Sequence, residues 1–209
     1  MGSSTSKGPG QRHDKGTAKE RLPLLADDSL NADQRRVSET LKSGPRRGVV
    51  GPFIPLLYAP NLCERIEALG SELRFFGTID RRVHELVVCY VAAATHNQYE
   101  WAVHVPVALS LGVSEEQIES LRTNQGLVEL SPVEASAVDF ASSLLEHHDV
   151  SDHVYDQALI QFGQNGVVEL TTIVSYFVMV SWLMNVAGTP APPHGTVKPL
   201  PPPKRDARS

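Results

Sequence analysis

The chain has 209 residues, of which 41% are hydrophobic and 21% charged, enough to bury one core. Its formal net charge of −5 argues against a nucleic-acid-binding protein, because such domains are usually basic. Residues 1–22 and 189–209 each carry a net charge of +3, which leaves −11 on residues 23–188. We therefore predict an acidic folded domain between a disordered basic N-terminal tail and a proline-rich basic C-terminal tail. The C-terminal tail is expected to be extended and solvated, with docking onto an acidic neighbour as the alternative.

Apolar residues at helical spacing run through the whole domain, and no segment reads as a strand. Asn31 and Ser151 are predicted N-cap residues, and Ser114 and Ser131 begin predicted capping boxes. The predicted helices span about 31–44, 61–76, 80–112 (continuous or broken near 95–97), 115–122, 132–147, 152–162 and 166–187. We expect an all-α helical bundle.

Residues 44–60 form an unusual segment, GPRRGVVGPFIPLLYAP. Its three glycines and four prolines argue against regular structure, yet most of the other residues are apolar. An apolar loop has to pack against something. We therefore expect this loop to line a pocket or a subunit interface.

The two cysteines, Cys63 and Cys89, show neither a disulfide framework nor the spacing of a zinc site, which indicates a reducing compartment. The N-terminus lacks the apolar core of a signal peptide, and the most apolar stretch, at 173–184, is too short to span a bilayer. These features predict a cytoplasmic protein without a membrane partner.

Histidines and carboxylates are concentrated among apolar positions in the middle of the chain. His96, Glu100 and His104 follow one another at intervals of four residues, so they share a face if their helix is continuous. Glu85 and His84 come from the preceding helical segment. A Glu–His pair in a dry pocket suits general acid–base catalysis, although the same pair also occurs as a purely structural contact. A metal site is disfavoured, because the outer two histidines would be about 12 Å apart along the helix.

The most distinctive stretch is HELVVCYVAAATHNQYEWAVHVPVAL at 84–109, with GPFIPLL at 51–57 before it and a helix ending LMNVAG at 183–188. Over roughly residues 31–188 the chain resembles the carboxymuconolactone decarboxylase family, also called the AhpD-like family. The resemblance implies an all-α, AhpD-like helical bundle that needs no cofactor and assembles as a homo-oligomer, a trimer or hexamer.

The redox members of that family carry the pattern E-x11-C-x2-C-x3-H. In this sequence the glutamate falls on Glu85 and the histidine on His104, but Asn97 and Glu100 stand at the two cysteine positions. Without a thiolate there is no thiol-based peroxidase chemistry, so that activity is disfavoured. Cys63 and Cys89 do not replace the missing pair and are interpreted as core residues.

The resemblance then points to the decarboxylase branch, which removes CO2 from a carboxylated unsaturated lactone. The substrate is its own electron sink, so the enzyme only has to bind a carboxylate, stabilise an oxyanion and protonate carbon. We predict His104 as proton donor, Glu85 as the residue that orients it or shares its proton, and Glu100 as a third catalytic group, while Arg46 or Arg47 holds the carboxylate. The remaining predicted substrate-binding residues are Phe53, His84, His96, Asn97, Tyr99 and Trp101.

The predicted function is therefore a cofactor-free and metal-free lyase that acts on a small carboxylated lactone or a related oxygenated compound. The alternatives are an isomerase or cyclase, or a non-catalytic ligand-binding protein of the same fold. The small-molecule substrate and further copies of the chain are the expected partners, and nucleic acid is not.

Overall fold

The computed structural model describes residues 19–126, 129–193 and 195–202. Over these residues the secondary structure is helical, which confirms the all-α prediction. A short 3-10 helix, η1 (Asp27–Ser29), precedes α1 (Ala32–Ser43), α2 (Phe53–Leu56), α3 (Pro60–Phe75), α4 (Arg81–Ala94), α5 (Gln98–Ser110), α6 (Glu115–Thr123), α7 (Pro132–His147) and α8 (Asp152–Ala187).

Side-chain caps fix most of the helix starts. Asn31, Ser114 and Ser131 each accept a hydrogen bond from the backbone N–H three residues later, in complete capping boxes. Ser151 caps α8 through the backbone N–H of Val154. These bonds satisfy backbone donors that the first turn of a helix leaves unpaired, which is why the boundaries follow from local sequence.

The apolar loop at 44–60 contains a helix that we did not predict. Residues Phe53–Leu56 form the single turn α2, which tolerates Pro55 because the first turn of a helix needs no backbone donor. Phe53, Leu56 and Leu57 are buried and pack with Cys63 of α3 and the apolar face of α1. The loop therefore packs within its own chain. Several of its residues, from Arg46 to Phe53, line the cavity described below.

The segment 80–112 breaks into two helices. α4 ends at Ala94, His96 has a left-handed backbone conformation (φ 54°), and α5 starts after Asn97, whose side chain accepts from the backbone N–H of Glu100. α8 combines the two predicted C-terminal helices, with non-helical backbone at Gly163 (φ 65°) between them.

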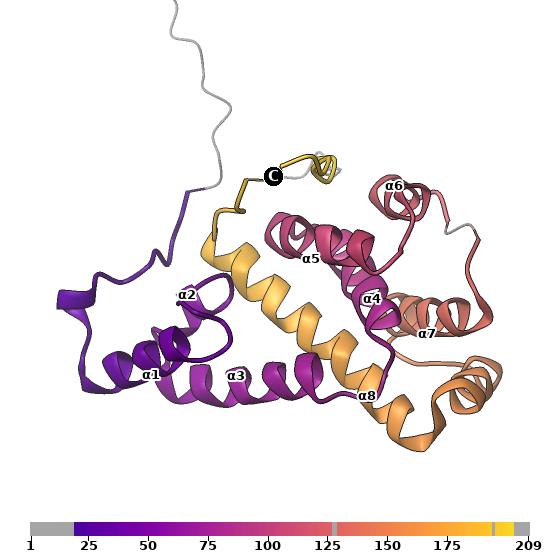
Figure 1. Cartoon of the computed structure of the whole chain (residues 1–209), viewed down its shortest axis with the longest axis horizontal. Coiled ribbons are helices and arrows are strands. Elements are labelled where there is room, and N and C mark those ends of the chain that lie inside the picture. The colour runs from indigo at the N-terminus through magenta and orange to yellow at the C-terminus, as the bar shows by residue number, and fades with distance from the viewer. Residues whose placement is uncertain (1–18, 127–128, 194, 203–209) are drawn as a thin grey trace, which may run out of the picture.

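α8 runs through the middle of the molecule, with α1 to α3 along one side and α4 to α7 along the other (Figure 1). α4 packs against α5, α7 and α8, and the largest core cluster joins α4, α7 and α8. By length and hydropathy α8 is able to cross a membrane, but half of its most apolar window is buried inside the protein. Its position identifies it as the central helix of the bundle.

The C-terminal segment is not solvated throughout, contrary to our expectation. Leu200 is 4% exposed and packs with Leu86 and Trp101. The Gln98 side chain accepts from the Leu200 N–H at 3.1 Å and donates to its carbonyl at 2.9 Å. The extended backbone thus docks on α5 of its own chain. The end of the predicted disordered N-terminal tail also contacts the domain, because the Arg21 backbone N–H donates to the Ala187 carbonyl at 2.6 Å. The remaining predictions for the two tails concern residues 1–18, 194 and 203–209, which lie outside the described residues.

Candidate functional site

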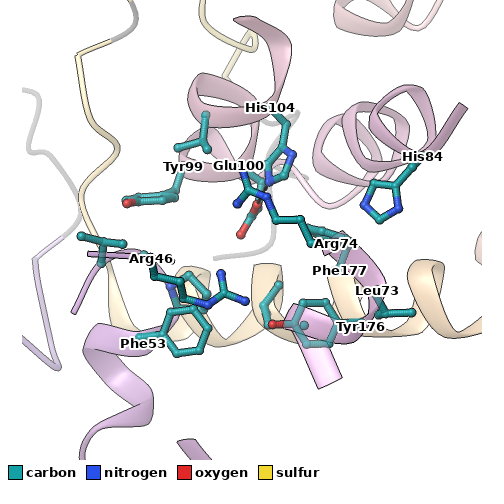
Figure 2. Close-up of a pocket in the computed structure, with 16 residues that line it drawn as sticks. Arg46, Phe53, Leu73, Arg74, His84, Tyr99, Glu100, His104, Tyr176 and Phe177 are labelled. Atoms are coloured by element: carbon teal, nitrogen blue, oxygen red, sulfur yellow. Dashed lines mark ion pairs between the residues drawn. The ribbon is translucent and has the colours of Figure 1, made fainter. Parts of the chain in front are cut away.

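A cavity of about 90 Å³ lies between α3, α4, α5, α8 and the loop that precedes α2. Figure 2 shows Tyr99, Glu100 and His104 of α5 on one side of this space and Arg46, Phe53 and Tyr176 on the other. Phe177 and Val180 of α8 contribute apolar surface. The arrangement places a few polar groups in an otherwise apolar enclosure, as is usual for small-molecule sites.

His104 is held between two carboxylates. Its Nδ1 lies 2.6 Å from Glu85 Oε2, and its Nε2 lies 3.0 Å from Glu100 Oε2. All three side chains are buried, and the His104 ring packs edge-to-face on Phe177 with ring centroids 5.3 Å apart. Glu85 lies behind His104, whereas Glu100 and His104 both line the cavity. The three groups form a hydrogen-bonded chain with one end at the cavity.

This geometry favours a charged imidazole. Burial alone would lower the pKa of His104, but the hydrogen bonds and charges of Glu100 and Glu85 raise it to about 9. Burial opposes ionisation of Glu85, yet the hydrogen bond and charge of His104 leave the Glu85 pKa below its ordinary value. At neutral pH, His104 therefore carries two N–H donors, one to each carboxylate.

His84 behaves in the opposite way. It is 3% exposed and lines the same cavity, with its ring edge-to-face against Phe177. Burial lowers the His84 pKa to about 4, a change that the charge of Glu85 only partly offsets. The imidazole is therefore neutral at neutral pH, and its Nε2 finds no hydrogen-bond partner among the described residues.

Two arginines bring positive charge to the cavity. The Arg46 guanidinium lies 4.3 Å from the centroid of the Phe53 ring, and its Nε lies 3.3 Å from Glu67 Oε1. Arg74, in the last turn of α3, is the second arginine. In Figure 2 its side chain extends into the space between the two walls. An anionic group of a ligand would be stabilised between them.

The structure brings most of the predicted site residues together. Arg46, Phe53, His84, Tyr99, Glu100 and His104 line the cavity, and Glu85 contacts His104 from behind. Tyr99 is half-buried, and its ring lies so close to Gly51 that a Cβ atom there would be 2.8 Å from Tyr99 Cε1. The positive φ of Gly51 (56°) also favours glycine.

Four predicted substrate-binding residues lie outside this cavity. Arg47 is exposed, with a left-handed backbone conformation that turns the chain away after Arg46. His96 precedes α5 rather than sharing its face, and its Nε2 lies 2.9 Å from the carbonyl oxygen of Pro201. His96 was grouped with Glu100 and His104 on the premise of a continuous helix. The interruption between α4 and α5 removes that premise.

Asn97 and Trp101 have structural contacts instead. The Asn97 amide donates to the carbonyl of Ser181 and to Asn185 Oδ1, both at 3.0 Å, which ties the start of α5 to α8. Trp101 is fully buried, and its Nε1–H donates to the Lys198 carbonyl at 2.9 Å. Successive side chains on a helix are about 100° apart around its axis, so Trp101 faces a different part of the protein from Glu100.

Sequence reasoning missed Arg74 and Tyr176. Both line the cavity, but neither lies on the two helices of the histidine-rich stretch: Arg74 is on α3, ten residues before His84, and Tyr176 is on α8. The sequence held one local indication that Arg74 is partly buried: it directly follows Leu73, an apolar residue of the helix face that is buried in the structure. Only the packing of α3 on α8 shows that it faces the cavity.

The other reactive side chains are less suited to chemistry. Cys63 and Cys89 are free and buried, as expected; burial raises the pKa of Cys63 to about 11 and that of Cys89 well above its usual value. Within the described part of the chain, no group of three or more His, Cys, Asp or Glu side chains is placed to hold a metal ion.

Comparisons with known proteins agree with this fold. The sequence profile of the Carboxymuconolactone decarboxylase family matches residues 60–143, which confirms the resemblance drawn from the sequence. This matched region includes Glu85, Glu100 and His104. No curated protein sequence matches the chain.

Several solved structures share the architecture. A peroxidase-related protein from Ralstonia eutropha, with an alkylhydroperoxidase AhpD core, is 18% identical over 79% of this chain and 88% of its own, with a TM-score of 0.64. A peroxidase-related protein from Silicibacter sp. is 15% identical over 85% and 93%, with a TM-score of 0.63. A cysteine-to-alanine variant of the debrominase Bmp8, in complex with 2,3,4-tribromopyrrole, is 12% identical over 84% and 93%, with a TM-score of 0.64. Such identities establish a common AhpD-like fold and leave the reaction open.

Proposed function

We propose that this protein is a cofactor-free enzyme that uses acid–base chemistry to decarboxylate a small carboxylated lactone or a related oxygenated compound. The observation that carries the proposal is the buried chain Glu85–His104–Glu100, which ends at a cavity that also contains arginine side chains. The chain can store and deliver a proton, and the arginines can hold an anionic substrate.

The proposed reaction breaks the bond between the substrate's carboxylate and its ring. CO2 leaves, and the electron pair spreads over the conjugated lactone as a dienolate whose charge lies on the carbonyl oxygen. Carbon then takes up one proton, which restores the neutral ring. The substrate carries the electron density throughout, so the protein has to supply only position, charge and a proton.

Glu100 is the group that we assign to the final proton transfer. Both ring nitrogens of His104 are engaged by carboxylates, so His104 delivers its proton through Glu100. Glu85 remains charged, holds the ring and stabilises the imidazolium from the buried side. His104 is therefore the proton reservoir, a modification of its predicted role as direct donor.

The experiment is an assay with 4-carboxymuconolactone in D2O. The proposal expects release of CO2 and incorporation of one deuterium on carbon for each turnover. Glu100→Gln and His104→Asn should each lower kcat by about 10²- to 10⁴-fold, the usual contribution of a positioned acid or base. Glu116→Gln on the exposed face of α6 is the matched control and should retain activity.

The same assay separates the alternatives. An isomerase or cyclase would place deuterium in the product without release of CO2, and a ligand-binding protein would bind the compound without either change. Full activity in His104→Asn would contradict the proton chain. Thiol peroxidase activity is not proposed, because the cysteine positions of that pattern are Asn97 and Glu100 and the two cysteines present are buried.

A cytoplasmic location is proposed as well. The support is the pair of free cysteines, which is typical of a reducing compartment.

A further inference from the structure

Two buried polar atoms at the cavity have no hydrogen-bond partner among the described residues: Arg74 Nε and His84 Nε2. The other unpaired buried side-chain atoms belong to residues that do not line the cavity. An unpaired buried polar atom costs free energy, and native proteins rarely retain one without a reason. Two of them in one cavity indicate that a polar ligand completes the site.

The two arginines of the cavity differ in how fully they are already engaged. Arg46 Nε pairs with Glu67 Oε1, an atom that also accepts from the Ser71 hydroxyl at 2.6 Å, and its guanidinium stacks on Phe53. Arg74 Nε has no such partner in the described part of the chain. Burial lowers the pKa of Arg74, but an arginine stays protonated in a protein. The charges of Glu85 and Glu100 act on Arg74, but its Nε–H remains an unpaired donor at the cavity.

Gly70, one helical turn before Arg74, allows two further donor groups to approach this wall of the cavity. A Cβ atom at Gly70 would collide with the Tyr176 hydroxyl and would lie 2.9 Å from Arg46 Nη2. The missing side chain thus lets the hydroxyl and the second guanidinium approach α3 next to Arg74. Burial raises the pKa of Tyr176 to about 12, so its hydroxyl keeps its proton and can donate.

We propose that Arg74 binds the carboxylate of the substrate directly, with the Tyr176 hydroxyl as a neighbouring donor and Arg46 as a positioning residue. The Nε–H and one Nη–H of a guanidinium form a fork that matches the two oxygens of a carboxylate. This assignment rests on the proposed function for the class of substrate, a small carboxylate. It places the anionic group at the α3 wall of the cavity, beside Arg74.

The test follows the arginine Nε–H resonances by NMR while furan-2-carboxylate is added to the full-length protein. The Arg74 resonance is expected to shift and saturate, because its donor is unpaired, whereas the Arg46 resonance moves less. Arg74→Gln should weaken binding about tenfold or more, as expected for the loss of a charge-assisted bond, and Arg74→Lys should restore part of it. Arg65→Lys is the matched control, since Arg65 lies nine residues earlier on the exposed face of α3.

The outcomes separate this assignment from the proposed reaction. Binding that shifts only the Arg46 resonance, or that is unchanged in Arg74→Gln, overturns the assignment, as does the absence of furan-2-carboxylate binding to the wild-type protein. Because the readout needs no turnover, a shifted Arg74 resonance in a protein that releases no CO2 would support the anion site and refute the decarboxylase. Amide spectra of the variants show whether each one is folded.

Discussion

At the scale of single residues, two histidines in one cavity have opposite ionisation behaviour, and the cause lies in their partners. His104 has a carboxylate within 3.0 Å of each ring nitrogen, and its pKa rises to about 9. His84 is similarly buried but lacks a partner at Nε2 among the described residues, and its pKa falls to about 4. The same apolar surroundings therefore hold one imidazole charged and the other neutral.

This contrast predicts how stability depends on pH. The contribution of His104 is fully present below its unfolded pKa near 6.5 and is lost as pH rises towards 9, on the order of 3 kcal/mol. The contribution of neutral His84 is lost in the other direction, as pH falls from 6.5 towards 4. Urea unfolding across this range should give a maximum near pH 6.5.

A variant tests the assignment of the alkaline slope to His104. His104→Asn should be less stable throughout, since it leaves buried carboxylates without their cation, and its unfolding free energy should no longer fall between pH 6.5 and 9. His153→Asn, at an exposed position of α8, should keep the wild-type slope. An unchanged alkaline slope in His104→Asn would show that this pair does not determine it.

At the scale of elements, helix boundaries could be predicted because the forces that set them are local. Asn31, Ser114 and Ser131 bond backbone groups three residues away, so their sequence pattern is sufficient evidence. Glu85 and His104 could be paired because the family pattern fixes their separation. Arg74 and Tyr176 could not be placed in the site, since their orientation depends on the packing of α3 and α8, which no local pattern encodes.

The C-terminal segment was also beyond prediction, for a related reason. Its attachment depends on hydrogen bonds between residues about 100 positions apart, such as those of Gln98 with Leu200, and on burial of one leucine in an otherwise polar, proline-rich stretch. Composition alone describes such a stretch as a solvated tail.

This docking predicts that a short extended segment contributes to the stability of the domain. Leu200→Ala should lower the free energy of unfolding by about 2 to 3 kcal/mol, the lower part of the range for a buried leucine, because the site lies at the edge of its cluster. Lys198→Ala is the control, because its 74% exposed side chain makes only a solvent-exposed ion pair with Glu119 at 3.7 Å, while its carbonyl still accepts from Trp101. Equal stability of the two variants, measured by chemical denaturation, would contradict the docking.

At the scale of the whole molecule, the outer face of α8 is unusually apolar. Met179, Trp182 and Val186 follow one another at intervals of three and four residues and are 37%, 62% and 61% exposed. Val168, 67% exposed, lies 11 residues before Met179 on the same face of the helix, with Thr172 and Ser175 between them. This spacing places them in one stripe along the helix. The helix contacts the core with its other face, so the stripe is available to a second molecule.

We expect this stripe to join copies of the chain into a homo-oligomer, a trimer or hexamer. Trp182→Lys, which places a charge in the middle of the stripe, should shift the mass measured by light scattering towards the 22.8 kDa of one chain. Ile160→Lys is the control, because Ile160 is 71% exposed but precedes the change of direction at Gly163. A wild-type protein that is monomeric at all concentrations would refute the oligomer. Dissociation by Ile160→Lys but not by Trp182→Lys would place the interface on the other segment of α8.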